Sequence, residues 1–309
     1  MLIWRGAWIV LLFLFSTHAW AFGKKQKTYL MGVMGDSLSA ATFADTSVDI
    51  PGIQGLFRGS LENKPVQAEF LVTNKKNFSW SSGEKIHSHY LYLKDWMEMR
   101  GELLSVANVS FPGDKAKHLK RQAEQISEEV RTQKYLSLKY VTFMIGANDA
   151  CAEDSPVGTP NEKMAEQLKS AFGVLAQIYQ EERIKVLVSV IPKIPELGRK
   201  DVMETRTLGF LTCEQMRNEI MKYCNSITVW HSQEEYEKHL QVVIEKNLLI
   251  EKVVQEMSAE YPQLDLHLSH RFYEADIHPE ELAADCFHPN QNGQERISNE
   301  LWLDQPWFR

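Results

Sequence analysis

The sequence lacks an excess of positive charge, has few cysteines and contains almost no long apolar run. Its formal net charge is −7, from 34 basic and 41 acidic residues, which gives no indication of a nucleic-acid partner. Its four cysteines include no Cys-x-x-Cys pair, so their spacing matches no zinc motif. No internal repeat or Pro/Gly/Ser-rich linker divides the chain. The composition therefore favours one globular domain.

The only extended apolar run lies at the start of the chain. Arg5 precedes an apolar stretch over residues 7–15, which is too short to span a bilayer. Residues 19–21 read Ala-Trp-Ala, the small-x-small pattern of a cleavage site. We expect a signal peptide over residues 1–21, with an uncleaved anchor as the alternative. The mature domain, residues 22–309, is then exported and periplasmic or secreted.

Short apolar runs alternate with helical patterns along the rest of the chain. They predict strands at residues 29–34, 103–109, 140–145, 186–191 and 264–268. The longest predicted helix covers residues 232–260, and a last helix lies near the C-terminus. This alternation predicts an α/β fold, a three-layer, doubly wound sandwich. Its central parallel sheet has about five strands, with helices on both faces.

Local signals indicate where the remaining segments begin. Asp114 is expected to cap the helix after the second strand. Thr159 is expected to cap a helix whose first residue is Pro160. Residues 201–223 are expected to be mainly helical. Residues 46–78, which are rich in Gly, Pro and Asn, are expected to form a long insertion over the active end of the sheet.

Polar turns follow the first three predicted strands. Ser37 lies in a Gly-Asp-Ser-Leu-Ser turn between a strand and an expected helix start, a context that suits a nucleophile. Gly113 and Asn148 follow the next two strands, and each is a candidate oxyanion donor. Each turn alone has a purely structural interpretation. Because carboxyl ends of parallel strands share one edge of the sheet, we expect the three turns to meet.

His288 is the candidate base, because Asp285 precedes it by three residues. On a single turn, this spacing brings the carboxylate to Nδ1 and leaves Nε2 to accept the serine proton. His278, two residues after Asp276, is the alternative base. Four further histidines occur in two close pairs without a carboxylate or cysteine to complete a metal site, and we interpret them as surface residues. They are His87, His89, His267 and His270.

Taken in order, four blocks of the sequence resemble those of the SGNH (GDSL) hydrolases. The blocks are Gly35-Asp36-Ser37-Leu38, Gly113, Gly146-x-Asn148-Asp149 and Asp285-x-x-His288. Flanking residues are most similar to the phospholipase B-like branch, at residues 79–81, 108–113, 145–151, 285–289 and 301–302. The resemblance extends from about residue 30 to residue 302, although residues 47–76 and 201–260 add little.

The resemblance implies a role for each matched residue. Ser37 is the nucleophile, His288 the base and Asp285 the residue that orients the base. The Ser37 N–H, the Gly113 N–H and the Asn148 side chain form the oxyanion hole. No metal or organic cofactor is implied. The expected activity is that of an exported serine ester hydrolase of the phospholipase or lysophospholipase type. The expected partner of the protein is an acyl-ester lipid, which it would bind during transient contact with a membrane surface.

Three alternatives stay open at this point. In the first alternative, the substrate is an acetylated sugar or a lipid A-type acyl ester and not a phospholipid or lysophospholipid. A second alternative is a metal-dependent phosphoesterase with Asp36, Asn148, Asp149 and His288 as ligands. Those enzymes generally place a histidine directly after the asparagine, where this chain has Asp149. The third is a non-catalytic binding module on the same fold.

Four cysteines in an exported chain allow two disulfides, in three pairings. Cys151 follows Asn148 closely, and Cys286 lies between Asp285 and His288. If Asn148 and His288 converge on one reacting carbon, these two cysteines are also close together. The prediction is therefore that Cys151 pairs with Cys286, and Cys213 with Cys224.

Overall fold

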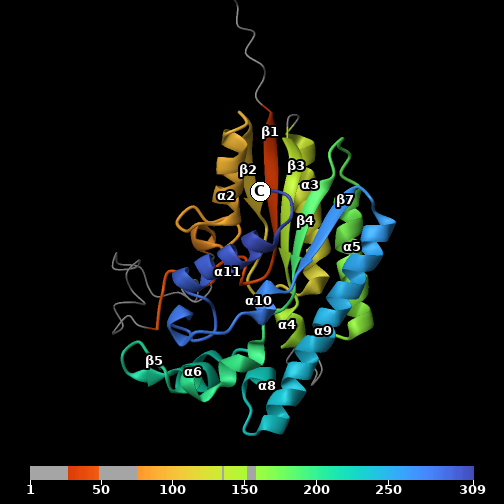
Figure 1. Cartoon of the computed structure of the whole chain (residues 1–309). Helices are drawn as coiled ribbons and strands as arrows, with labels where there is room; N and C mark the ends of the chain where they lie inside the picture. The colour runs from red at the N-terminus through yellow and green to blue at the C-terminus, as the bar shows by residue number, and fades with distance from the viewer. Residues whose placement is uncertain (1–26, 49–74, 134–135, 152–157) are drawn as a thin grey trace, which may run out of the picture.

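The chain folds around a five-stranded parallel sheet in the order β2-β1-β3-β4-β7 (Figure 1). The computed structural model describes residues 27–48, 75–133, 136–151 and 158–309. The strands are β1 (Thr28–Gly35), β2 (Leu103–Asn108), β3 (Leu136–Met144), β4 (Ile184–Ser189) and β7 (Leu264–Ser269). All neighbouring pairs are parallel. The five predicted strands and the α/β fold class are confirmed.

Helices occupy most of the connections between the strands. The α-helices are α2 (His89–Glu98), α3 (Leu119–Thr132), α4 (Ala147–Ala150), α5 (Asn161–Ala176), α6 (Lys200–Glu204), α7 (Cys213–Gln215), α8 (Asn225–Thr228), α9 (Gln233–Glu260), α10 (Arg271–Glu274) and α11 (Gln291–Asp304). Short 3₁₀ turns are η2 (Lys76–Phe78), η3 (Ala116–His118), η4 (Ile194–Gly198) and η6 (Pro279–Glu281), and η5 (Met216–Met221) is a π-helix.

Two hydrophobic cores lie on the two faces of the sheet. Successive side chains of a strand point to opposite faces, and β1 follows this rule with apolar residues on both sides. Leu30 and Met34 pack in the core that contains α3, α5 and α9. Tyr29, Met31 and Val33 pack in the core that contains α2 and α11. Burial on both faces explains why this strand reads as an unbroken apolar run.

The long helix α9 begins where its sequence predicts. Ser232 occupies the N-cap position, and its Oγ accepts a hydrogen bond from the Glu235 N–H at 3.2 Å. The buried side of α9 packs against α5 and β7. Its buried residues are Val243, Lys246, Asn247, Ile250, Val253, Val254 and Met257.

Two predicted helix caps are wrong. Asp114 does not cap α3; its Oδ2 accepts hydrogen bonds from Arg121 and Gln122, and η3 precedes the helix. Pro160 takes the N-cap position that was expected for Thr159, because its extended ψ of 137° keeps it outside the helix. The backbone N–H of Thr159 instead donates to the Asp149 carbonyl oxygen at 2.8 Å.

The segment between β4 and α9 is less helical than predicted. A two-stranded antiparallel hairpin, β5 (Arg206–Thr207) and β6 (Leu211–Thr212), separates α6 from α7. Leu208 and Gly209 adopt left-handed backbone angles, with φ of 54° and 79°, and reverse the chain. We call residues 199–230 the insertion; it lies beyond the carboxyl edge of the sheet, with β5 and α6 at the bottom of Figure 1.

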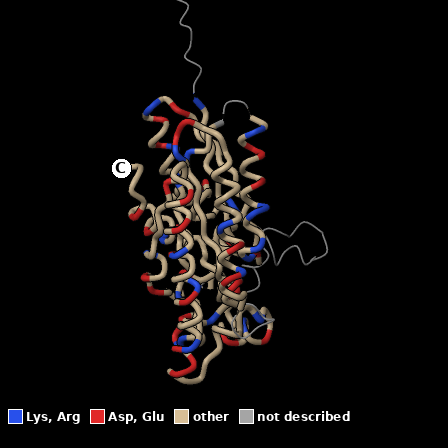
Figure 2. The backbone as a smooth tube through the Cα atoms, turned by 90° about the vertical axis from the view of Figure 1, so that its right-hand side faces the viewer, with Lys and Arg blue, Asp and Glu red and all other residues tan. Residues whose placement is uncertain are grey.

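Some sequence predictions lie outside the described residues. They include the signal peptide, residues 1–21. They also include residues 49–74, the central part of the stretch 46–78 that was expected to lie over the active end of the sheet. In the ranges that the structure covers, no helix combines the length and apolar character needed to cross a membrane. Figure 2 shows Lys and Arg interspersed with Asp and Glu along this part of the chain.

Candidate active site

Ser37 lies in a tight turn directly after β1. Gly35, the last residue of the strand, has a φ of 151°, and a Cβ there would lie 2.4 Å from the Met144 carbonyl oxygen. Only glycine fits such an approach. The backbone then makes one helical turn, with the Ala40 N–H bonded to the Asp36 carbonyl oxygen at 2.9 Å. Ser37 is 8% exposed.

The helix expected after Ser37 does not continue. Residues 36–45 form a succession of turns, in which Ala41 and Phe43 have φ of 54° and 59°. Left-handed angles are rare for residues with a side chain. The turn therefore lacks the regular helix that the sequence predicted. Negative charge that develops near Ser37 must be stabilised by individual N–H groups and not by the N-terminus of a helix.

Asp285 and His288 form a buried pair. Oδ2 of Asp285 lies 2.6 Å from Nδ1 of His288, while Oδ1 accepts the backbone N–H groups of Phe287 and His288 at 3.1 Å each. Both side chains are buried. A carboxylate accepts hydrogen bonds only, so Nδ1 carries the proton and Nε2 keeps its lone pair in neutral imidazole.

The turn that holds Ser37 packs along the loop that holds this pair. Thr46 Oγ1 accepts a hydrogen bond from the Ala284 N–H at 3.0 Å. The Phe43 ring lies 6.0 Å from the His288 ring, measured between centroids. Among the described residues, Ser37 Oγ and His288 make no hydrogen bond with each other. Catalytic hydrogen bonds often tighten only when substrate binds.

The expected oxyanion donors lie at the same edge of the sheet. Asn148 Nδ2 donates one hydrogen to the Asp114 carbonyl oxygen at 3.0 Å, which leaves the second hydrogen of its amide. Gly113 has a φ of 79°, and the space beside its Cα is open. In the described chain, the N–H groups of Ser37 and Gly113 have no hydrogen-bond acceptor. These three donors can receive a developing negative charge.

Buried carboxylates surround the turn. Burial raises the pKa of Asp36 to about 7; the Leu38 N–H and His288 lower it, and Asp149 and Asp114 raise it. Burial also raises the pKa of Asp149, whose Oδ2 accepts the Ala116 N–H at 2.9 Å. No group of three or more His, Cys, Asp or Glu side chains within the described ranges could hold a metal ion.

The alternative base and two of the other histidines have different surroundings. His278 is exposed at the rim of the pocket described below, and the Asp276 carbonyl oxygen accepts a hydrogen bond from Arg296 at 2.7 Å. His267 Nε2 lies 3.3 Å from Asp304. His89 was interpreted as a surface residue; this is wrong, because its side chain is fully buried.

The predicted disulfide pairing is also wrong. Cys151 pairs with Cys224, and Cys213 pairs with Cys286, with Cα–Cα distances of 4.8 and 5.3 Å. The prediction joined the loop that holds Asn148 directly to the loop that holds His288. In the structure each loop is instead bonded to the insertion, whose position the sequence did not reveal. The insertion also donates a hydrogen bond from Thr207 Oγ1 to the Ala284 carbonyl oxygen at 2.6 Å.

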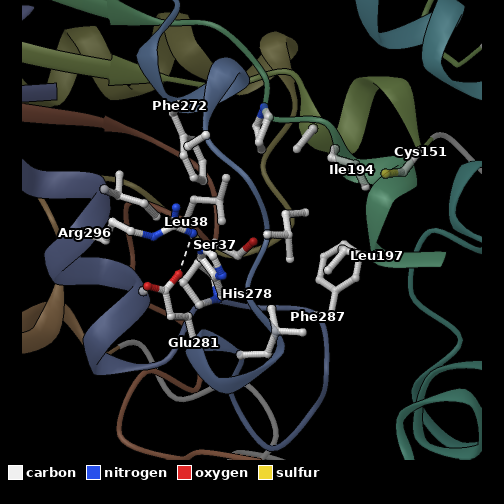
Figure 3. Close-up of a pocket in the computed structure, with 18 of the residues that line it drawn as sticks. Ser37, Leu38, Cys151, Ile194, Leu197, Phe272, His278, Glu281, Phe287 and Arg296 are labelled. Carbon is white, nitrogen blue, oxygen red and sulfur yellow. Dashed lines mark ion pairs between the residues drawn. The ribbon is translucent and has the colours of Figure 1, made fainter. Parts of the chain in front are cut away.

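A pocket opens beside Ser37 and Asn148. Figure 3 shows Ile194, Leu197 and Phe287 on one side of Ser37 and the Arg296–Glu281 ion pair on the other. The ion pair has an Nη2–Oε2 distance of 2.5 Å. Sequence reasoning missed these residues, because no motif marks them and they come from separate segments.

The sequence of the chain matches one family of known proteins. The family profile of the GDSL-like lipase/acylhydrolases matches residues 31–301. No curated protein matches the chain in sequence.

Solved structures resemble the chain distantly. The structure described as TesA is 14% identical, over 89% of this chain and 97% of its own, with a TM-score of 0.44. A psychrotrophic esterase, EstA from Pseudoalteromonas sp., is 13% identical, with coverages of 89% and 95% and a TM-score of 0.43. A family 3 carbohydrate esterase from Clostridium thermocellum is 11% identical, with coverages of 89% and 94% and a TM-score of 0.44. Likeness at this level carries no argument about substrate.

Proposed function

This chain belongs to the GDSL-like lipase/acylhydrolase family, and from that premise we propose that it is an exported serine esterase acting on phospholipids or lysophospholipids. The observation that carries the proposal is the buried Asp285–His288 pair beside the turn that holds Ser37. The two disulfides are compatible with an exported protein. No cofactor enters the proposed reaction.

In the first step, Ser37 Oγ attacks the ester carbonyl carbon while His288 Nε2 accepts the hydroxyl proton. Asp285 stabilises the imidazolium that forms. The carbonyl oxygen becomes negative and is met by the Ser37 N–H, the Gly113 N–H and the Asn148 amide. The ester C–O bond then breaks, His288 gives its proton to the leaving alcohol, and the acyl group stays on Ser37.

In the second step, a water molecule takes the place of the released alcohol and hydrolyses the acyl-enzyme. His288 accepts a proton from the water as its oxygen attacks the acyl carbon, and the same donors hold the second oxyanion. Collapse releases the carboxylic acid and returns the proton to Ser37. An asparagine amide suits this role because it donates without ionising; loss of one such donor typically costs about 10²–10³ in turnover.

The pocket supports an amphiphilic ester as the substrate. Its walls are mainly apolar, with Ile194, Leu197 and Phe287 among the lining residues, and such surface favours an acyl chain. The Arg296–Glu281 pair and exposed His278 add charged and polar groups to the same pocket. An acyl chain with a charged or zwitterionic headgroup matches this combination better than an acetylated sugar does.

A hydrolysis panel tests the proposal with the full-length chain. The substrates are a phospholipid, a lysophospholipid, a short chromogenic ester, an acetylated sugar and a lipid A-type acyl ester. We expect fatty acid release from the lipids to be fastest, to survive a chelator and to stop after treatment with an organophosphonate. Ser37→Ala should lose about 10⁴-fold or more in turnover, because the nucleophile and base act as one unit.

Ser39→Ala is the matched control. Ser39 lies on the same turn, is buried, and its Oγ has no hydrogen-bond partner in the described part of the chain. It should keep the activity of the unmodified enzyme. Activity that persists in Ser37→Ala, or that a chelator abolishes, would refute the serine mechanism. Preference for the acetylated sugar would refute the lipid assignment alone.

A further inference from the structure

The hydrogen bond to Asp285 holds His288 at one edge only. One bond from Nδ1 fixes the position of an atom, but it leaves the ring plane free to tilt. Three aromatic rings pack against the imidazole and limit that tilt. The centroid distances from His288 are 6.0 Å to Phe43, 5.8 Å to Tyr223 and 5.0 Å to Phe287.

The backbone that presents these rings is strained. Six residues other than glycine have positive φ in the described chain, and five of them lie on the three segments that carry the rings. The five are Ala41, Phe43, Lys222, Cys224 and Cys286. Left-handed angles persist only where the surrounding structure enforces them, and they concentrate at functional sites.

Tyr223 stands apart from the other two rings because it comes from the insertion. Lys222 and Cys224 flank it, with φ of 53° and 54°. Cys224 is bonded to Cys151, three residues after Asn148. The tripeptide of residues 222–224 therefore contacts the candidate base through its ring and is covalently joined to the loop of a candidate oxyanion donor.

Tyr223 contacts His288 through its ring: the two rings meet at 74°, and among the described residues no hydrogen bond joins the two side chains. Burial, and then the Asp285 carboxylate, raise the pKa of Tyr223 to about 12, so the hydroxyl stays neutral at ordinary pH. The Tyr223 ring also lies 5.6 Å from the Phe287 ring at 58°, and Phe287 lines the pocket. The Tyr223 ring thus packs against both the imidazole and a residue that lines the pocket.

We propose that Tyr223 is a positioning residue that holds the plane of the His288 imidazole, with the Cys151–Cys224 disulfide holding Tyr223 in place. This role rests on the proposed function, in which Nε2 must face Ser37 Oγ. Asp285 fixes the tautomer of His288, and the ring of Tyr223 restricts the tilt of the imidazole plane. The Cys151–Cys224 disulfide fixes the position of Tyr223 relative to the loop that holds Asn148. Residues without a contact to the reacting atoms would in this way influence the rate of proton transfer.

Two substitutions at this position test the role, with a short chromogenic ester as the substrate. We expect Tyr223→Ala to lower kcat by about 10–100-fold with KM changed less than about twofold, because small misplacements of catalytic groups are costly. Tyr223→Phe keeps the ring and should restore kcat. Phe210→Ala, an exposed aromatic on the same insertion, is the matched control and should leave both constants unchanged.

Reaction with an organophosphonate separates positioning from folding. In Tyr223→Ala the number of sites labelled at completion should stay the same, and the rate of labelling should fall with kcat. A purely structural role would instead lower the number of labelled sites and leave the rate of the remainder unchanged. That result, or an unchanged kcat, would overturn the proposal.

The disulfide provides a second, independent test. The double variant Cys151→Ser, Cys224→Ser keeps the other bridge and should lower kcat in the same way. Adding Tyr223→Ala to it should cost much less than in the unmodified enzyme, because residues that act together are not additive. Full additivity would overturn the link to Tyr223. A chain that reacts with neither ester nor phosphonate would overturn the proposed function and this role together.

Discussion

His89 and His288 are both buried and both packed against aromatic rings, but their hydrogen bonds differ. His89 Nε2 lies 3.1 Å from the Ser298 carbonyl oxygen, and its Nδ1 lies 2.9 Å from the Tyr140 hydroxyl. A carbonyl oxygen can only accept, so Nε2 donates and Nδ1 accepts. His288 bonds to a carboxylate through Nδ1, and its Nε2 has no partner among the described residues.

This difference shows that partners, rather than burial, separate a structural histidine from a candidate base. Burial lowers the pKa of His89 to about 3, against the effect of its bond to Ser298. No carboxylate in the described chain bonds to it to stabilise a charged ring, so it stays neutral and links α2 to β3 and α11. His288 has a carboxylate partner and one open nitrogen, the two features that a general base requires.

The largest effect is expected from removal of the imidazole at position 288. His288→Ala should lower kcat on a chromogenic ester by about 10⁴-fold or more, since nucleophile and base act as a unit. Its thermal melting temperature should fall as well, because the buried Asp285 carboxylate loses its imidazole partner, so kcat is compared per folded molecule. Steady-state kinetics and a thermal melt on the same sample measure both. Turnover of His288→Ala near that of the unmodified enzyme would refute the assignment of His288 as the general base.

The reciprocal change at position 89 should affect stability instead. His89→Phe keeps an aromatic ring but leaves the Tyr140 hydroxyl and Ser298 carbonyl unpaired, at a cost of about 1–3 kcal/mol each. Urea denaturation should show the loss, while kcat per folded molecule stays unchanged. A large fall in kcat of the folded fraction would show that this region communicates with the active site.

A third effect, which appears only as a dependence of stability on pH, concerns Asp36, whose carboxylate interacts with His288. Its pKa rises from the ordinary aspartate value of 3.8 to about 7 in the fold, so the folded protein binds more protons than the unfolded chain within this window. Stability should therefore fall as the pH rises from about 4 to about 7, by at most about 1.4 kcal/mol per pH unit from this group.

Asp36→Asn should remove that contribution and flatten the dependence. Asparagine keeps an oxygen for the Leu38 N–H, which lies 3.0 Å from Asp36 Oδ1. Urea denaturation of both proteins at several pH values gives the two curves. Curves that run parallel between pH 4 and pH 7 would show that Asp36 is not the group responsible.

Much of the fold and the central pair followed from patterns local in sequence. Apolar runs predicted the five strands, of which β1 and β4 are almost wholly buried and β2 and β7 only partly buried. The spacing of Asp285 and His288 gave their hydrogen bond, because three residues on one turn bring the groups together. The roles assigned to Ser37, Gly113 and Asn148 stay predictions, although the structure places all three at the carboxyl edge.

Features that depend on distant segments were not predicted. His89 was interpreted as a surface residue because no nearby carboxylate or cysteine completes a metal site, whereas its hydrogen-bond partners Tyr140 and Ser298 lie far along the chain. Tyr223 carries no motif and meets His288 only because the insertion folds back on the loop. The disulfides were mispaired for the same reason, since nearness of two loops does not reveal a third segment between them.

The two disulfides have a topological consequence. In chain order the half-cystines run 151, 213, 224 and 286, so the span closed by Cys151–Cys224 overlaps the span closed by Cys213–Cys286. A single backbone cut anywhere between Cys151 and Cys286 therefore lies inside at least one closed span. The two pieces stay covalently linked, and a nicked molecule would migrate as separate fragments only after reduction. Ser37 and His288 therefore remain on one covalent unit after such a cut.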